Sequence, residues 1–297
     1  ASDVYKRQVY EAESLRKNGI NGEIAILGFC EDFGLAREIA ARPLVYDEHT
    51  LCLAKKYDAE VFVKINTGMN RLGFSTIGET ASAVKNLRVL GVFTHLSSAD
   101  GDDATDRRIT EAQIKNFMEA ELVVKNEKDV PFYAENSAAL IKYGRFFDGA
   151  RIGIALYGVN PVPGDQTLLL PVMTFRAAVI AINTVKKGDF IGYSRGYRAK
   201  KDMRVAIIST GYADGLPRAL SNKGTIFCNG QFLKIVGKVS MDSVAVDAGD
   251  ADVKIMDEVV VFGDEITVTD VANRADTLPY EILTGVSERV KRVYKNP

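Results

Sequence analysis

The sequence predicts an α/β fold: a (β/α)8-type barrel domain that lacks its first strand or strands, followed by a β-rich carboxyl-terminal domain. In the first half of the chain, short apolar runs alternate with segments of helical spacing, which is typical of a parallel sheet or barrel. In the second half, apolar runs are separated by short turns such as Asn229-Gly230, which indicate a β-rich domain. The composition changes between the halves at residues 157–164, where prolines and glycines gather as in a linker.

The first half contains about six runs with the length and composition of strands. They cover residues 23–29, 43–46, 61–65, 89–96, 132–135 and 150–154. Residues 76–87 and 106–125 have the spacing and length of helices. Because a complete barrel has eight strands, we expect the first one or two to be absent from this sequence.

The ends of the chain and the domain boundary follow from the same patterns. Residues 1–8 show no period, so we expect a non-native or unstructured start and a missing amino terminus, before a helical segment that ends at Gly19. We place the partial barrel domain at residues 9–160 and the β-rich domain at residues 161–297. In the β-rich domain we predict strands at 172–184, 204–209, 224–228, 232–240, 244–247 and 258–262, and helices at 268–274 and 278–284.

The composition narrows the class of ligand. The 38 basic and 39 acidic residues leave a net charge of −1, which argues against a nucleic-acid or anionic-lipid surface and favours a small ligand. Cys30, Cys52 and Cys228 are few and widely spaced, so we predict no disulfide framework, no metal site and a reducing cytoplasm. No apolar run reaches the roughly 18 to 20 residues that span a bilayer, so we expect no membrane segment within this chain.

The most informative stretch is VFVKINTGMNRLGF, residues 61–74. An apolar run ends in a polar turn with glycines, which is how a buried strand delivers side chains into a site. In this turn, Arg71 could bind a carboxylate or phosphate through two parallel hydrogen bonds. An arbitrary arginine after a core strand is more often only solvated.

Other polar segments follow strands, where a barrel places its functional side chains. In the first domain these segments are THLSSAD at 94–100, NSAA at 136–139 and RIGIALYG at 151–158. A lone histidine such as His95 or His49 is more often structural, and NSAA alone is only a helix cap. The second domain contains GYSRGYR at 192–198, GYADGLPR at 211–218 and VGKVSMDS at 236–243.

Together these segments resemble, in order, motifs of the alanine racemases, which are barrel-type pyridoxal-phosphate enzymes. The matching family patterns are KxDTGMxRLG, THFASAD, ANSAA, VRPGIALYG, GYG with GYADGxPR, and VGRVSMD. The resemblance runs from about Val9 to the end of the chain. It implies racemisation of L-alanine and D-alanine, with D-alanine supplied for the cell wall.

The resemblance also implies a role for each matching residue. Pyridoxal 5'-phosphate would be bound by His95, Asn136, Ser137, Arg151, Gly153 and Ile154. Substrate would be bound by Arg71 and by the backbone amide of Met241, with Lys64, Tyr212 and Asp242 in support. Tyr193 would be one of two catalytic bases, and the family's cofactor-binding lysine would be the other. In the family, the counterpart of Lys64 is sometimes carbamylated, and the counterpart of Tyr193 reaches the partner's active site, which implies a homodimer.

The chain departs from the family pattern at several positions. The family's cofactor-binding lysine lies in an AVVKANAYGHG segment that is not found here, and Lys6 does not match it. Asn66 replaces an aspartate, Tyr133 a histidine and Glu288 a tyrosine. Two alternatives therefore stay open: a serine-preferring racemase of the vancomycin-resistance type, and a catalytically inactive fragment. A related barrel decarboxylase is disfavoured by Tyr193 and by the GYADG segment.

Overall fold

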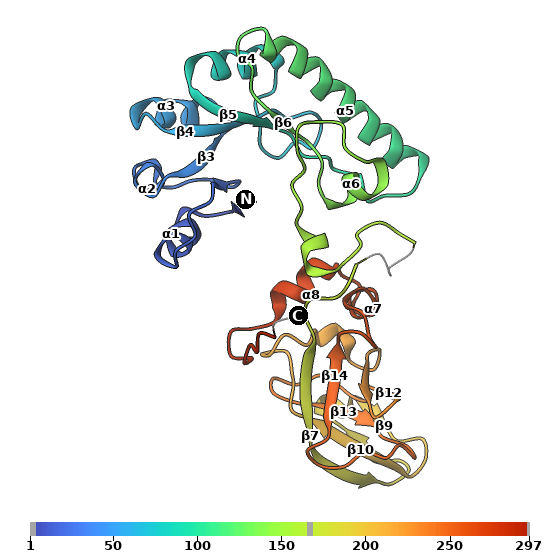
Figure 1. The fold of residues 1–297 in the computed structure, drawn as a ribbon. Coiled ribbons are helices and arrows are strands. Elements are labelled where there is room, and N and C mark those ends of the chain that lie inside the picture. Colours follow the sequence, from blue (N-terminus) through green and yellow to red (C-terminus); the bar gives the residue numbers. More distant parts are fainter. Residues whose placement is uncertain (1–3, 165–168, 296–297) are drawn as a thin grey trace. The chain divides into compact units, whose positions relative to one another are not determined.

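The computed structural model describes residues 4–164 and 169–295, which form two compact units (Figure 1). Unit one comprises residues 4–155 and 160–164, and unit two comprises residues 156–159 and 169–295. Within these described ranges, no helix has both the length and the apolar character needed to cross a lipid bilayer.

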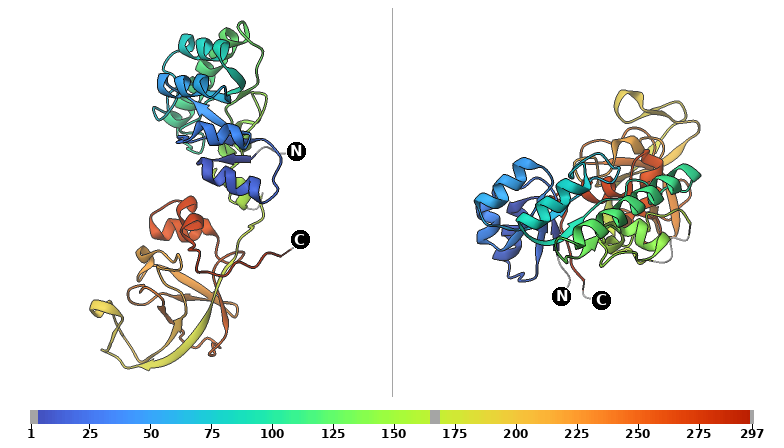
Figure 2. Two further views of the ribbon diagram at one scale, coloured as in Figure 1. Left: turned by 90° about the vertical axis from the view of Figure 1, so that its left-hand side faces the viewer. Right: turned by 90° about the horizontal axis from the view of Figure 1, so that it is seen from above.

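Unit one is a parallel sheet of six strands in the order β1-β2-β3-β4-β5-β6. The strands are β1 (Val4–Lys6), β2 (Ile24–Ile26), β3 (Ala41–Val45), β4 (Glu60–Lys64), β5 (Arg88–Phe93) and β6 (Phe132–Tyr133). The helices are α1 (Val9–Lys17), α2 (Phe33–Glu38), α3 (Glu48–Lys56), α4 (Ile77–Asn86), α5 (Ala104–Lys125) and α6 (Ser137–Tyr143). This alternation of strand and helix confirms the predicted parallel, barrel-like sheet, and Figure 2 shows the helices from two further sides.

The strands of unit one bury different side chains on their two faces. In β4, Val61 and Val63 belong to the main core, where they pack with residues of the helices. Phe62, between them, belongs to a second cluster with Phe93 and Tyr133. Alternate residues of a strand point to opposite faces, so the helices cover one face and an aromatic group fills the other.

Two parts of unit one differ from the prediction. Residues 4–6 were expected to be unstructured, but they form β1, which pairs in parallel with β2. Three residues are too few to show the alternating pattern of a strand, and charged residues follow them. The predicted strand at 150–154 is not formed either: a single bridge joins Tyr133 to Gly149, and the 3-10 helix η1 (Ile154–Tyr157) follows. Residues 1–3 lie outside the described part of the chain.

Glu135 helps to place the segment that leads to Arg151. Its fully buried carboxylate accepts hydrogen bonds from the backbone amides of Phe146 and Phe147, and its carbonyl oxygen accepts one from the Arg151 amide at 2.7 Å. This side chain was not identified from the sequence. It fixes the turn after α6 against the end of β6, which sets the position of Arg151.

Unit two is antiparallel, as the short turns predicted. Its larger sheet has six strands in the order β12-β11-β14-β7-β10-β13, and β8 pairs with β9 in a small separate hairpin. The strands are β7 (Phe175–Val185), β8 (Phe190–Ile191), β9 (Tyr197–Arg198), β10 (Met203–Ile208), β11 (Thr225–Cys228), β12 (Gln231–Lys234), β13 (Val244–Asp247) and β14 (Glu258–Phe262). Helices α7 (Val268–Ala275) and α8 (Pro279–Gly285) follow. The predicted strand at 232–240 is shorter in the structure, because residues after Lys234 turn into a loop.

Candidate active site

The candidate residues of unit one lie where β4, β5 and β6 end. Lys64 is the last residue of β4, and His95 follows β5 by two residues. Asn136 and Ser137 begin α6 directly after β6. The carboxyl ends of neighbouring parallel strands meet at one edge of the sheet, so the fold brings these residues together.

Asn66 organises the loop that carries Arg71. Its side-chain oxygen accepts hydrogen bonds from the amides of Gly68 at 3.1 Å and Asn70 at 2.9 Å, and its amide group donates to Asn70 Oδ1 at 3.0 Å. The base of the loop is closed by backbone bonds that join Asn66 and Lys64 to Phe74. An asparagine therefore holds this turn without adding a negative charge beside the cations of the site.

Replacing Asn66 with alanine is expected to loosen this loop, because two backbone amides lose their acceptor. We expect unit one to lose about 1 to 2 kcal/mol of stability. Denaturant unfolding measures this loss, and hydrogen exchange at Gly68 and Asn70 should accelerate. Asn86→Ala is the matched control, since Asn86 bonds only within its own helix. Unchanged exchange at both amides would contradict the assigned role.

Arg151 connects the ends of two strands. Its guanidinium donates to the carbonyl oxygens of Thr94 and, at 3.4 Å, Ala134, and lies 3.4 Å from Nδ1 of His95. It also lies over the ring of Phe93, 5.1 Å from the ring centroid. An arginine cannot act as an acceptor, so His95 Nδ1 accepts and we assign the ring proton to Nε2.

The charged groups that shift the pKa of His95 are all positive. Burial is the main cause that lowers the pKa of His95 from 6.5 to about 3, and Arg151, Arg71 and Lys64 contribute in that order. Burial also lowers the pKa of Lys64 to about 8, with contributions from Arg71 and Arg151. The imidazole is therefore neutral at physiological pH, and the strand ends carry a cluster of cations, Lys64, Arg71 and Arg151. Such a cluster is suited to an anionic ligand.

The neutral state of His95 predicts a pH dependence of stability. Between pH 6.5 and about 3, the unfolded chain binds a proton at His95 that the folded protein does not, so stability falls as the pH falls. We expect His95→Gln to remove on the order of 2 kcal/mol of the loss between pH 7 and pH 4. Denaturant unfolding at several pH values measures it. His49→Gln, at an exposed site, should leave the loss in place, and parallel curves for wild type and His95→Gln would refute the assignment.

Gln113 is a buried polar side chain of the site that was not identified from the sequence. It lies on α5 and is 2% exposed. Its amide group donates to Thr67 Oγ1 at 3.4 Å and to the His95 carbonyl at 3.1 Å, while its oxygen accepts from the Ser97 amide at 2.9 Å. It thereby ties the Arg71 loop to the His95 segment. A buried polar position on an amphipathic helix was the only available sequence signal.

Asn136 and Ser137 form a second polar group at the end of β6. Asn136 caps α6 by accepting from the Ala139 amide, and it donates to the Leu96 carbonyl at 3.3 Å. Ser137 Oγ accepts from the amide of Gly153 at 3.0 Å. A Cβ atom at Gly153 would meet nothing within 4 Å, so there is open space beside this backbone. Ile154 is buried and begins η1.

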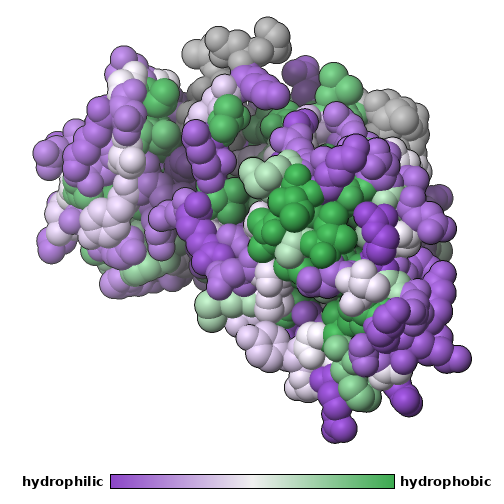
Figure 3. Space-filling view, turned by 90° about the horizontal axis from the view of Figure 1, so that it is seen from below, coloured by the Kyte–Doolittle hydropathy of each residue, from purple (hydrophilic) through white to green (hydrophobic). Residues whose placement is uncertain are grey.

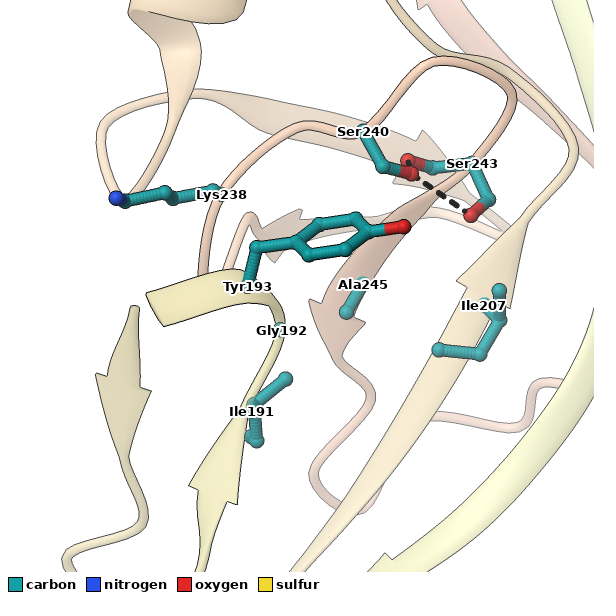
Figure 4. A pocket seen from close by; sticks show the side chains of 8 residues that line it. All are labelled: Ile191, Gly192, Tyr193, Ile207, Lys238, Ser240, Ser243 and Ala245. Atoms are coloured by element: carbon teal, nitrogen blue, oxygen red, sulfur yellow. Dashed lines mark hydrogen bonds between the residues drawn. The ribbon is translucent and has the colours of Figure 1, made fainter. Parts of the chain in front are cut away.

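Unit two contains Tyr193 at a cavity of about 400 Å³. The tyrosine begins the 3-10 helix η3 (Tyr193–Arg195) between β8 and β9, and it is 73% exposed. Figure 4 shows its hydroxyl pointing toward Ser240 and Ser243, which hydrogen-bond to each other. Among the described residues, nothing hydrogen-bonds to this hydroxyl. It is available to a ligand.

The remaining predicted residues of unit two lie on two adjacent loops. The Tyr212 amide donates to the Ser240 carbonyl at 3.0 Å, so the Tyr212 loop and the Met241 loop pair. Asp242 accepts a hydrogen bond from Arg289 at 2.7 Å. Met241 is 52% exposed, and its amide has no acceptor among the described residues. Arg289 was not identified as a site residue from the sequence.

Two residues at which this chain departs from the family pattern, Tyr133 and Glu288, lie in different units. Tyr133 is packed edge-on against Phe62 and Phe93. Its ring fits because Gly91 and Gly149 have no side chain: a Cβ atom at these positions would lie only 2.7 and 2.9 Å from the ring. Tyr133 is therefore an integral member of the aromatic group in unit one. Glu288 is exposed in unit two.

Comparison with known proteins relates both units to one family. The family model described as alanine racemase, N-terminal domain, matches residues 1–161, and the one described as alanine racemase, C-terminal domain, matches residues 172–294. An alanine racemase of Aquifex aeolicus is 35% identical over 288 residues, which cover 96% of this chain and 81% of that protein.

Solved structures give the same result. The alanine racemase of Streptomyces coelicolor superposes with a TM-score of 0.92 at 28% identity and covers 100% of this chain and 85% of its own. The alanine racemase of Bartonella henselae, with covalently bound pyridoxal phosphate, superposes with a TM-score of 0.86 at 30% identity and covers 99% and 85%. The fold and these matches define an isomerase that acts on amino acids. The chain belongs to the alanine racemase family.

Proposed function

We propose that the protein racemises L-alanine and D-alanine with pyridoxal 5'-phosphate and so supplies D-alanine for the cell wall. The observation that carries this proposal is the cluster of Lys64, Arg71 and Arg151 around the neutral His95. Both the cofactor phosphate and the amino-acid carboxylate are anions, and such a cluster favours their binding. The family membership of both units supports the same reaction.

The residues of unit one fit the proposed cofactor. The open backbone at Gly153, with the Ser137 hydroxyl beside it and Ile154 following, is suited to a phosphate group. Arg151 would face the ring nitrogen, and the neutral His95 beside it would lie against the ring. Asn136 would hold the adjoining segment through its bonds to Leu96 and Ala139.

The chain's lysines are not assigned to covalent attachment. Lys6 lies at the end of β1 and forms a 3.9 Å ion pair with Glu11. Lys64 lies among the cations of the site and is buried, with an exposed fraction of 6%. A lysine attacks carbon dioxide as its neutral amine and releases a proton when the carbamate forms. The pKa of about 8 leaves part of Lys64 neutral near physiological pH, so we propose that Lys64 is open to carbamylation, as in the family.

When bound, pyridoxal phosphate supplies an electron sink for the carbanion that forms at Cα. Because the pKa of arginine exceeds about 12, Arg151 keeps its protons and does not donate one to the ring nitrogen, which disfavours transamination. Arg71 and the Met241 amide would orient the substrate carboxylate. The Tyr193 hydroxyl would take up or return the α-proton on one face.

We also propose a homodimer and a cytoplasmic location. The face in Figure 3 presents hydrophobic side chains gathered in one area among hydrophilic ones, as protein interaction surfaces do. Tyr193 is exposed beside a cavity in its own unit, and in a dimer it would contribute to the partner's site. All three cysteines are free, which fits a reducing compartment.

The direct test is deuterium exchange at the α-carbon of alanine in deuterated water with pyridoxal phosphate present. Borohydride reduction followed by peptide mapping identifies any lysine that carries the cofactor. We expect exchange from both enantiomers, and faster exchange with alanine than with serine. No exchange and no modified lysine would reject the proposal for this chain, while faster exchange with serine would reject the assigned substrate.

A further inference from the structure

Arg289 joins three segments of unit two at one guanidinium group. Its Nε donates to Asp214 Oδ1 and its Nη2 donates to Asp242 Oδ1, both at 2.7 Å. Asp214 also accepts from the Gly211 amide at 2.9 Å, and its carbonyl oxygen accepts from the Ser287 amide at 3.2 Å. The tail, which is the segment after α8 that contains Arg289, is thereby joined to the Tyr212 loop through Asp214 and to the Met241 loop through Asp242.

The two loops are packed directly against each other. The Tyr212 amide donates to the Ser240 carbonyl and the Ala213 amide to the Met241 carbonyl, each at 3.0 Å. A Cβ atom at Gly211 would lie 2.3 Å from both of these carbonyl oxygens, so only glycine permits this approach. The position of the Met241 amide therefore depends on how the Tyr212 loop is held.

The two carboxylates pose an electrostatic problem for an anionic ligand. Asp242 directly follows Met241, and Asp214 lies in the paired loop. Burial opposes the ionised form of Asp214, but the bonds from Arg289 and Gly211 outweigh it and hold the pKa of Asp214 below its ordinary value. The hydrogen bonds to Asp214 and Asp242 raise the pKa of Arg289. Asp214 is thus held in its charged form, and Arg289 is the cation that both carboxylates contact.

We infer that Arg289 is a positioning residue for carboxylate binding at the Met241 amide. It fixes the loop that presents the amide, and it cancels the negative charges that would repel an incoming carboxylate. This inference rests on the proposed function, which makes the Met241 amide a contact of the substrate carboxylate. Arg289 does not contact the substrate in this account, because both donors that face the loops are already bonded to aspartates.

Titration of the isotope-labelled 297-residue protein with D-alanine tests the inference without relying on turnover. The readout is the NMR resonance of the Met241 amide, which reports the apparent Kd of the carboxylate. For Arg289→Gln we expect an apparent Kd at least about tenfold higher than for wild type. Arg289→Lys keeps the charge but cannot span both aspartates, so an intermediate Kd is expected. Where racemisation is measured, KM should rise more than kcat falls.

Arg176→Gln is the matched control. Arg176 forms a 2.6 Å ion pair with Glu258 of the same unit, which belongs to neither loop, so its removal costs one surface ion pair and should leave the apparent Kd within about twofold of wild type. If Arg289→Gln does not fold, Arg289→Lys decides the question. Wild-type affinity in a folded Arg289 variant overturns the inference.

The outcome is separable from that of the proposed function. No response of the Met241 amide in the wild-type protein overturns the inference about Arg289, while racemisation is judged by the exchange assay. A response that is lost in Arg289→Gln, in a protein that exchanges no α-proton, supports the positioning role and rejects the racemase proposal for this chain.

Discussion

In a version of the protein that contains the family's cofactor-binding lysine, replacing Tyr193 with phenylalanine is expected to suppress α-proton exchange from one enantiomer of alanine by at least about 100-fold, with a much smaller effect on the other enantiomer. The change removes only the hydroxyl oxygen. That oxygen points toward the Ser240–Ser243 pair and has no hydrogen-bond partner among the described residues, so the fold should be unaffected (Figure 4). Deuterium incorporation into L-alanine and D-alanine, followed separately, measures the asymmetry.

The control for this experiment is Tyr197→Phe. Tyr197 lies four residues further on, in β9, and packs against a core cluster that includes Ile191 of β8 and Val205 of β10; it does not line the cavity. It should leave both exchange rates within about threefold of wild type. Equal suppression of both enantiomers by Tyr193→Phe would count against a base that acts on one face only.

The fold could be predicted where the sequence carries a clear period. Val61 and Val63 alternate with Phe62 in a strand that is buried on both faces, and the apolar run around them was sufficient to identify β4. The strand β1 was missed because its three residues show no period. The predicted strand at 150–154 was wrong because the chain forms a single bridge to β6, at Gly149, and the Arg151 amide bonds to the Glu135 carbonyl before a 3-10 helix begins at Ile154.

The site could be predicted where a residue type and its neighbours in sequence define its role. Arg71 lies in the loop that follows β4, His95 lies two residues after β5, and the structure places both near Lys64 and Arg151. Gln113 and Arg289 act across the fold, 46 residues from Thr67 and 75 residues from Asp214. No local pattern could connect such pairs, because the contact exists only once helix α5 or the tail has folded against its loop.

Replacing Arg151 with glutamine is expected to have the largest effect within unit one. The guanidinium bonds to the Thr94 and Ala134 carbonyls and lies over the Phe93 ring, and a shorter neutral amide cannot reach all three. We expect a loss of stability on the order of 2 kcal/mol, since buried acceptors are left without donors. Cofactor affinity should fall as well, because one of the three cations near His95 is removed.

The same substitution makes a prediction about proton binding that a general loss of stability does not. Arg151 is the strongest of the charges that lower the pKa of His95, after burial itself. In Arg151→Gln the His95 pKa should therefore rise from about 3, yet stay below 6.5 because the ring is still buried. With only two histidines in the chain, NMR titration of the ring protons resolves the effect.

Arg145→Gln, at an exposed position in the same unit, should leave the titration unchanged. If Arg151→Gln behaves like Arg145→Gln, the charge of Arg151 does not act on His95, and the proposed arrangement at the cofactor ring fails with it.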